Sequence, residues 1–309
     1  MAMGFVEADV ISALQKIFAT NDSRVQVGIG DDAAVLSTST QTLLSSDMAV
    51  QDVHFTIEWS SAFDIGRKIT AANTADILAM GGSCDFLTAS VALTGNESLT
   101  WVEELARGMK FEAVLAGAHI VGGDIARSEK VVISMTALGH TSHPILRSGA
   151  QIGDSIFISS LPGWSAAGLE LLSRKNDSQS SAAKKALAEF SAPTIDYATD
   201  FSRATSMVDL SDSLIIQGAQ VADASGVCLQ LDEDLFAQSP EFLELASLAS
   251  ALDIEIFQFI YAGGEDHVLL ATGLELPGIK IGTVIAGSGI TGMKSKVAPV
   301  SWSHFGKGK

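Results

Sequence analysis

Strand-like and helix-like segments alternate along both halves of the 309-residue chain. Residues 86–93 form a short run rich in β-branched and apolar residues, which is typical of a strand. In residues 63–80, by contrast, apolar side chains recur every three or four positions, which is the period of an amphipathic helix. This alternation predicts an α/β or α+β fold, in which helices pack on sheets.

The length of the chain allows two domains, each with its own core. We place the boundary in the polar turn RSGAQIGD, so that residues 1–148 form the first domain and residues 149–309 the second. An amphipathic helix is expected over residues 10–18. A third helix is expected over residues 100–118, with Thr100 as its N-cap.

Composition excludes several classes of protein. Hydrophobic residues make up 47% of the chain, as in folded globular proteins. The net charge of −17 argues against a nucleic-acid partner. No apolar run is long enough to cross a bilayer, and the first residues are acidic where a secretory signal is basic, so we expect a cytoplasmic protein without a membrane partner. Cys84 and Cys228 alone cannot build a disulfide framework.

Acidic clusters recur at glycine turns, strand ends and helix starts. A single such acid is ordinary, because aspartate caps helices and closes turns. Asp76 is different, since it continues the apolar face of the predicted helix, where an unpartnered carboxylate is costly to bury. Acids at the ends of neighbouring strands would converge and repel, and Mg²⁺ relieves that repulsion. The clusters are GDD (30–32), SSD (45–47), Asp76, GGD (122–124), DLSD (209–212) and GGED (263–266).

The chain lacks the G-x-x-x-x-G-K-[ST] loop that cradles phosphates in many nucleotide-binding proteins. Phosphate binding would therefore depend on metal ions, assisted by a guanidinium such as that of Arg147. Three residues also have ordinary structural explanations. His54 could be a structural histidine after a strand, Arg147 a surface charge, and Trp302 part of a core.

Seven motifs in this order resemble those of thiamine-monophosphate kinases: GIGDDAAVL, SSDMAVQDVHF, KITAANTADILAMGG, VGGDIARS, LRSGAQIGD, VDLSDSL and GGEDHVLL. The resemblance implies a two-domain fold like that of aminoimidazole ribonucleotide synthetase. Residues 1–148 would bind ATP and Mg²⁺ and pair with their counterpart across a homodimer, and residues 149–309 would close over nucleotide and substrate. The implied reaction is the ATP-dependent phosphorylation of thiamine monophosphate to thiamine diphosphate, with several Mg²⁺ ions.

The resemblance also implies roles for individual residues. The implied metal ligands are Asp32, Ser45, Ser46, Asp47, Asp76, Asp124, Asp209 and Asp212. The implied nucleotide contacts are Gly123, Asp124, Arg147 and Ser211, of which Asp124 and Arg147 are the catalytic pair. The implied substrate contacts are His54, Glu265 and Trp302. The sequence departs from the family pattern at Ser213, where glycine is usual, and at His267, where tyrosine is usual.

The acceptor in this reaction is a phosphate monoester, which is already anionic near neutral pH, so direct in-line transfer needs no general base. Other readings stay open at this point. They are another ATP-using enzyme of the same superfamily, a metal-dependent phosphohydrolase, and a non-catalytic protein that uses its acids only for structure.

Overall fold

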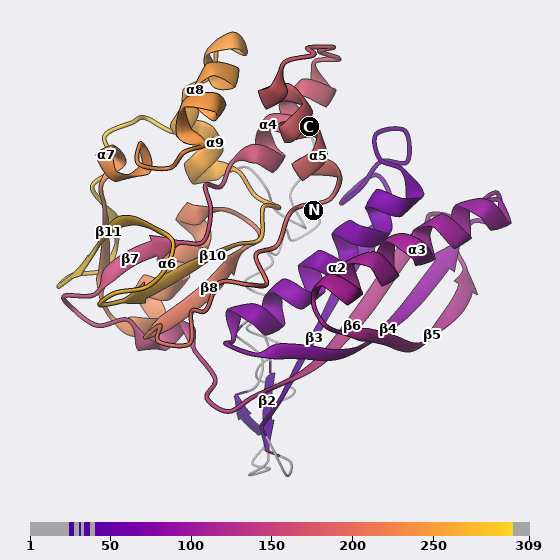
Figure 1. Ribbon diagram of the computed structural model, residues 1–309, viewed down its shortest axis with the longest axis horizontal. Coiled ribbons are helices and arrows are strands. Elements are labelled where there is room, and N and C mark those ends of the chain that lie inside the picture. Colours follow the sequence, from indigo (N-terminus) through magenta and orange to yellow (C-terminus); the bar gives the residue numbers. More distant parts are fainter. Residues whose placement is uncertain (1–24, 28–30, 32–33, 38–40, 299–309) are drawn as a thin grey trace, which may run out of the picture.

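A computed structural model describes residues 25–27, 31, 34–37 and 41–298 of the chain. The helix predicted over residues 10–18, the candidate ligand Asp32 and the candidate substrate contact Trp302 lie outside these residues. Within them, two six-stranded sheets, each with its own helices, occupy the two halves of the molecule (Figure 1). The prediction of a mixed fold of helices and sheets is confirmed.

The N-terminal sheet has the strand order β1-β2-β3-β6-β4-β5. All neighbours run antiparallel except β4 and β5, which are parallel. Helices α2 and α3 lie along one face of this sheet (Figure 1). The elements are β1 (Val25–Val27), β2 (Ala34–Ser37), β3 (Gln41–Val50), α2 (Ala62–Ala79), β4 (Ser83–Leu93), α3 (Leu99–Leu115), β5 (His119–Arg127) and β6 (Val132–Thr141).

No helix of the described residues covers the opposite face of the N-terminal sheet (Figure 1). Burial alternates along β3, so that Leu43 and Ser45 are buried on the helix-covered face while Ser46 and Met48 are exposed on the open face. Phe86 and Leu138, which pair with each other across β4 and β6, are also exposed large apolar residues. The open face therefore presents apolar side chains to its surroundings.

Helices α2 and α3 cross at two glycines that leave no room for side chains. A Cβ atom on Gly66 would lie 2.1 Å from the carbonyl oxygen of Leu105, and a Cβ atom on Gly108 would lie 1.9 Å from that of Phe63. The two backbones are therefore in direct contact, which fixes the position of α2 on the sheet.

The C-terminal sheet has the strand order β12-β9-β11-β7-β10-β8 and is antiparallel except for the pair β9 and β12. A short helix, η1 (Arg147–Gly149), lies in the connection between the halves. The other elements are β7 (Ser155–Ile158), α4 (Trp164–Ser173), α5 (Ser181–Ser191), β8 (Ser206–Leu210), α6 (Leu214–Ser225), β9 (Cys228–Leu231), α7 (Glu233–Phe236), α8 (Phe242–Ala251), α9 (Ile256–Ala262), β10 (Val268–Gly273), β11 (Ile279–Ile285) and β12 (Gly289–Thr291).

Among the described helices, none by itself has the length and apolar composition of a membrane span, and only the bent pair α8 and α9 would meet both criteria together.

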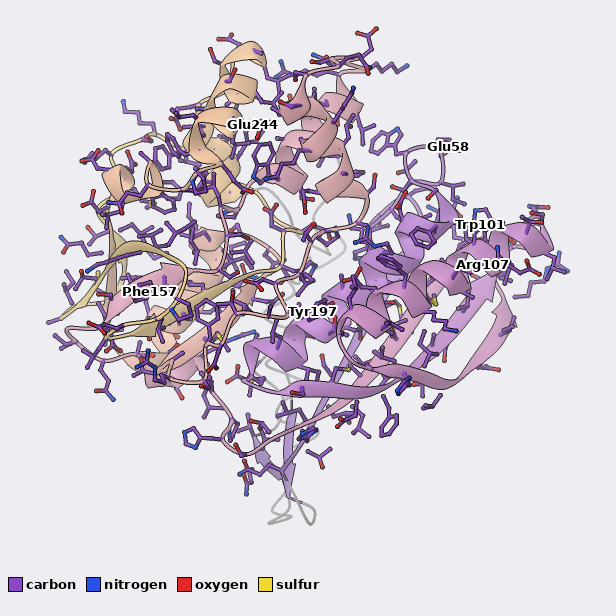
Figure 2. All side chains as sticks on the ribbon, in the orientation of Figure 1. Glu58, Trp101, Arg107, Phe157, Tyr197 and Glu244 are labelled. Atoms are coloured by element: carbon purple, nitrogen blue, oxygen red, sulfur yellow. The ribbon has the colours of Figure 1, made fainter. Side chains whose placement is uncertain are left out.

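A buried polar network ties the two halves beside α2, where Tyr197 lies at the junction (Figure 2). The Tyr197 hydroxyl donates to Glu112 Oε1 at 3.0 Å and lies 2.7 Å from Thr74 Oγ1. Arg67 Nε donates to the other Glu112 oxygen at 3.1 Å. Burial raises the pKa of Glu112 although Arg67 opposes that rise. The network leaves neither oxygen of this buried carboxylate without a donor.

Three details of the sequence prediction were wrong. Asp47 lies within β3, which continues to Val50, and not at the end of a strand. The GGD motif, expected at a glycine turn, lies within β5. Helix α3 is capped by Ser98, whose Oγ accepts from Trp101 N at 3.1 Å, and Thr100 lies in its first turn. Serine and threonine are both frequent N-caps, so the sequence offers Ser98 as well as Thr100 for this position.

Candidate active site at the junction of the halves

Acids from both halves of the chain meet at the junction. Asp47 comes from β3, Asp209 from β8 and Glu265 from the loop between α9 and β10. His267 joins them, with its Nδ1 atom 2.8 Å from Asp209 Oδ2. We call Asp47, Asp209, Glu265 and His267 the junction cluster. Three of the predicted site residues are thus brought together from motifs far apart in the sequence.

The junction cluster crowds charges that are buried at Asp209 and His267 and partly buried at Asp47 and Glu265. Burial raises the pKa of Asp47, His267 opposes the rise, and the carboxylates of Asp209 and Glu265 add to it. Burial alone would lower the pKa of His267, but its hydrogen bond to Asp209 and the surrounding negative charge raise it overall. The cluster therefore favours a protonated imidazole and disfavours a further negative charge.

The segment that carries Glu265 and His267 has an unusual backbone. Glu265 has φ of 65° and His267 has φ of 52°, so both are in the left-handed region that side-chain-bearing residues rarely adopt. Such conformations cost free energy and persist where the surroundings impose them, often at functional sites. Here they place both side chains in the junction cluster.

Asp266, between these two residues, anchors the segment to helix α4. Its buried carboxylate accepts from Gly163 N at 2.7 Å and from Ser165 N at 2.9 Å, at the start of that helix. Burial raises the pKa of Asp266 to about 6, although both backbone donors oppose the rise. The sequence analysis gave Asp266 no role, because an acid next to Glu265, a candidate substrate contact, has no distinctive pattern of its own.

The same segment is anchored on its other side to the end of β8. Glu265 N donates to the carbonyl oxygen of Ser211 at 2.6 Å, and a Cβ atom on Gly264 would lie 2.4 Å from that of Asp212. The glycine thus lets the GGED segment pack directly on the DLSD segment. These two motifs, 50 residues apart in the sequence, form one structural unit.

Helix α2 supplies polar groups to the helix-covered side of β3. Ser45 Oγ donates to Asp76 Oδ2, and Asn73 Oδ1 accepts from Asp47 N at 3.1 Å. The carboxylate of Asp76, anomalous on an apolar helix face, therefore points toward the strand that carries Asp47. Asn73 was not predicted, since a helical asparagine is usually structural.

Two predicted ligands do not lie with the junction cluster. Ser46 is exposed, and its Oγ donates to Met135 O at 3.0 Å. Asp124 lies on β5, opposite Ser90 of β4. Two strands separate β5 from β3, so Asp124 lies about 14 Å from β3 at ordinary strand spacing. Gly123 and Asp124 instead line a largely apolar cavity of about 710 Å³ between α3 and the edge of the sheet.

Gln217 on α6 organises the DLSD segment. Its Nε2 donates to Ser211 Oγ at 3.0 Å and to Asp212 Oδ2 at 3.3 Å. Both departures from the family pattern also have structural roles. Ser213 caps α6 by accepting from Ile216 N at 3.2 Å, and His267 pairs with Asp209.

Arg147 and His54 have partners within the chain. Arg147 Nε lies 3.4 Å from an oxygen of Asp31, the first acid of the GDD motif. His54 Nδ1 accepts from Val50 N at 3.0 Å, which leaves Nε2 as the nitrogen that carries the proton in the neutral ring. Burial raises the pKa of Glu265, but Lys68, His267 and His54, in that order, oppose the rise and lower the pKa overall. Among the described residues, no group of three or more His, Cys, Asp or Glu side chains is arranged to hold a metal ion.

Comparison with known proteins decides the family. Residues 30–141 match the family of AIR synthase related protein, N-terminal domain. A thiamine-monophosphate kinase of Mycobacterium tuberculosis is 35% identical over 250 residues, covering 80% of this chain and 74% of that protein. The chain belongs to the thiamine-monophosphate kinase family. A family member from Aquifex aeolicus is 30% identical over 98% of this chain and 100% of its own length.

The fold agrees with this membership over nearly the whole chain. A solved structure described as AaThiL complexed with AMPPCP and TMP superposes with a TM-score of 0.87 at 28% identity, and the match covers 97% of each chain. The two-domain fold expected from the motifs is therefore confirmed. By its family, the protein that carries the junction cluster is a kinase.

The substitution Asp266→Asn should change how stability depends on pH. With a folded pKa of about 6 against an ordinary value of 3.8, folded Asp266 keeps a proton that the unfolded chain has released. Its contribution to the free energy of unfolding therefore falls as pH rises from about 4 to about 6. The free energy of unfolding of the wild type minus that of the variant should be larger at about pH 4.5 than at about pH 7.5, by about 2 kcal/mol. Urea denaturation measures this difference, and a value independent of pH would contradict the prediction.

Proposed function

We propose that the junction cluster is where the protein phosphorylates thiamine monophosphate to thiamine diphosphate with ATP, the reaction of the family to which the chain belongs. The observation that supports this most is the meeting of Asp47, from the first half, with Asp209 and Glu265, from the second. A site made from both halves suits a reaction that must hold two separate anionic substrates in line.

The chemistry of the donor set fits Mg²⁺. The carboxylates of Asp47 and Asp209 come together in a buried place where a further negative charge is disfavoured, and oxygen ligands of this kind are those that Mg²⁺ takes. Bound there, Mg²⁺ would neutralise phosphate charge and stabilise the transferred group. We propose as its ligands Asp47 and Asp209, with further contributions from the predicted ligands Asp32, Ser45, Asp76 and Asp212.

The chain's own residues would bind and orient the two substrates. We propose that Ser211, Gly123 and Asp124 contact the nucleotide and that the Arg147 guanidinium assists the transferring phosphoryl group. Glu265 would contact the permanently cationic thiazolium ring of thiamine monophosphate, together with His54 and Trp302. The acceptor phosphate is already ionised, so the transfer is direct and no side chain need remove a proton.

We also propose a separate role for each half of the chain. Residues 1–148 would bind ATP and Mg²⁺ and form the homodimer, and residues 149–309 would close over nucleotide and substrate. The exposed apolar side chains of the open face support pairing through the first half, as does the edge of β5 that pairs with no other described strand. A cytoplasmic location without nucleic-acid or membrane partners stays a prediction from composition.

Chromatography of the reaction products tests the function. With ATP, Mg²⁺ and thiamine monophosphate, the protein should produce thiamine diphosphate and ADP in equal amounts, and chelation of the metal by EDTA should stop both. Thiamine as an alternative acceptor is run in parallel. Release of inorganic phosphate without thiamine diphosphate would instead support a phosphohydrolase, and absence of any turnover would contradict the proposal.

The substitution Asp47→Asn should lower kcat at least about 100-fold, because it removes a charged metal ligand. It should not lower the free energy of unfolding, since burial and the neighbouring carboxylates already disfavour the Asp47 charge. Steady-state kinetics and urea denaturation measure the two quantities. Asp234→Asn, at an exposed acid, is the control. Unchanged turnover in the Asp47 variant would exclude it as a ligand.

The substitution Leu138→Asp should convert a dimer into a monomer, because it places a charge on the open face of the N-terminal sheet. Sedimentation velocity measures the mass. Leu243→Asp, at a leucine that is 79% exposed on α8, is the matched control and should leave the mass unchanged. Equal masses for the wild type and both variants would argue against pairing through this face.

A further inference from the structure

Lys68, on α2, reaches from the first half of the chain into the second. Its Nζ atom lies 2.6 Å from Glu265 Oε2 and donates to the carbonyl oxygen of Phe190 at 3.0 Å. The same ammonium lies 4.6 Å from the centre of the Phe190 ring. The Lys68 side chain is only 11% exposed. Neither the motifs nor the proposed function gives this residue a role.

A buried ammonium is costly unless its charge and its donors are satisfied. Lys68 meets that requirement with a carboxylate, a carbonyl oxygen and an aromatic face, and all three belong to the second half. Helix α2 itself is fixed by its backbone contact with α3. The ammonium is therefore held at a defined place at the junction.

Glu265, the partner of Lys68, has little freedom to adjust. Its backbone is in the left-handed region and its N–H is bonded to Ser211 O. Among the described ion pairs, the one made by the Glu265 carboxylate is with Lys68. The direction of this carboxylate thus depends on the ammonium.

We propose that Lys68 is a positioning residue for thiamine monophosphate, which acts by holding the Glu265 carboxylate in place for the cationic ring of the substrate. This inference rests on the proposed function, in which Glu265 contacts that ring. Lys68 also opposes the effect of burial and lowers the pKa of Glu265 overall, so the carboxylate stays charged for a cationic ligand.

A merely structural tie between the halves would have different consequences. Loss of such a tie would lower stability and weaken the binding of both substrates, since both are proposed to lie between the halves. A residue that acts through Glu265 affects one substrate selectively, and its effect disappears once Glu265 has been changed.

The experiment measures kcat and both KM values for the wild type, Lys68→Met, Lys68→Arg, Glu265→Gln and the double variant Lys68→Met/Glu265→Gln. We expect Lys68→Met to raise the KM for thiamine monophosphate about tenfold, with kcat and the KM for ATP within about twofold of wild type. Lys68→Arg, which keeps the charge in a different shape, should restore part of the loss. The double variant should have the KM of Glu265→Gln alone. Lys294→Met, which breaks an exposed lysine–aspartate pair, is the matched control.

Several results would overturn the inference. They are an equal rise in both KM values, a KM for thiamine monophosphate that stays at the wild-type value, and effects of the two substitutions that multiply in the double variant. If Lys68→Met does not fold, the cycle of Lys68→Arg with Glu265→Gln gives the same test. Thiamine diphosphate formation by the wild type separates the two proposals. Its absence would contradict the function, whereas its presence with any of these results would contradict the role of Lys68 alone.

Discussion

The structure depends on the repulsion between carboxylates that two separate sheets bring to one place. Asp47 enters from the first sheet, and Asp209 enters from the second. Neither sheet needs these acids for its own core, and each is a cost to folding wherever no positive charge is near. Such an arrangement suits the cations that we propose for the site, which are Mg²⁺ and the cationic ring of thiamine monophosphate.

Two side chains of the chain itself reduce the repulsion between these carboxylates. The imidazole of His267 pairs with Asp209, and the ammonium of Lys68 pairs with Glu265. Both pairs depend on the GGEDH segment, whose left-handed residues are held between the start of α4 and the end of β8. The strain in this segment and the charge of the cluster are therefore parts of one arrangement, since relaxing the backbone would separate His267 from Asp209 and Glu265 from Lys68.

Sequence alone could predict the alternation of helices and strands and the family, because periodicity and ordered motifs are properties of the chain itself. It could also predict that Asp47, Asp209 and Glu265 belong to one site. It could not place Asp124, because the distance between β5 and β3 follows from the order of strands in the sheet. Lys68 and Asn73 lie within the motif KITAANTADILAMGG but were given no role, because a single polar residue on a helix is usually structural. The roles of Asp32 and Trp302 stay predictions, since both lie outside the described residues.

The contact between α2 and α3 has a consequence for how the molecule can open. Neighbouring helices slide past each other by small shifts within an interposed layer of side chains. At Gly66 and Gly108 that layer is missing, because the backbones themselves touch. Helix α2 must then travel with the first half as a rigid body, and Lys68 and Asp76 with it. Residues 142–154, the connection between the two sheets, join this rigid unit to the second half.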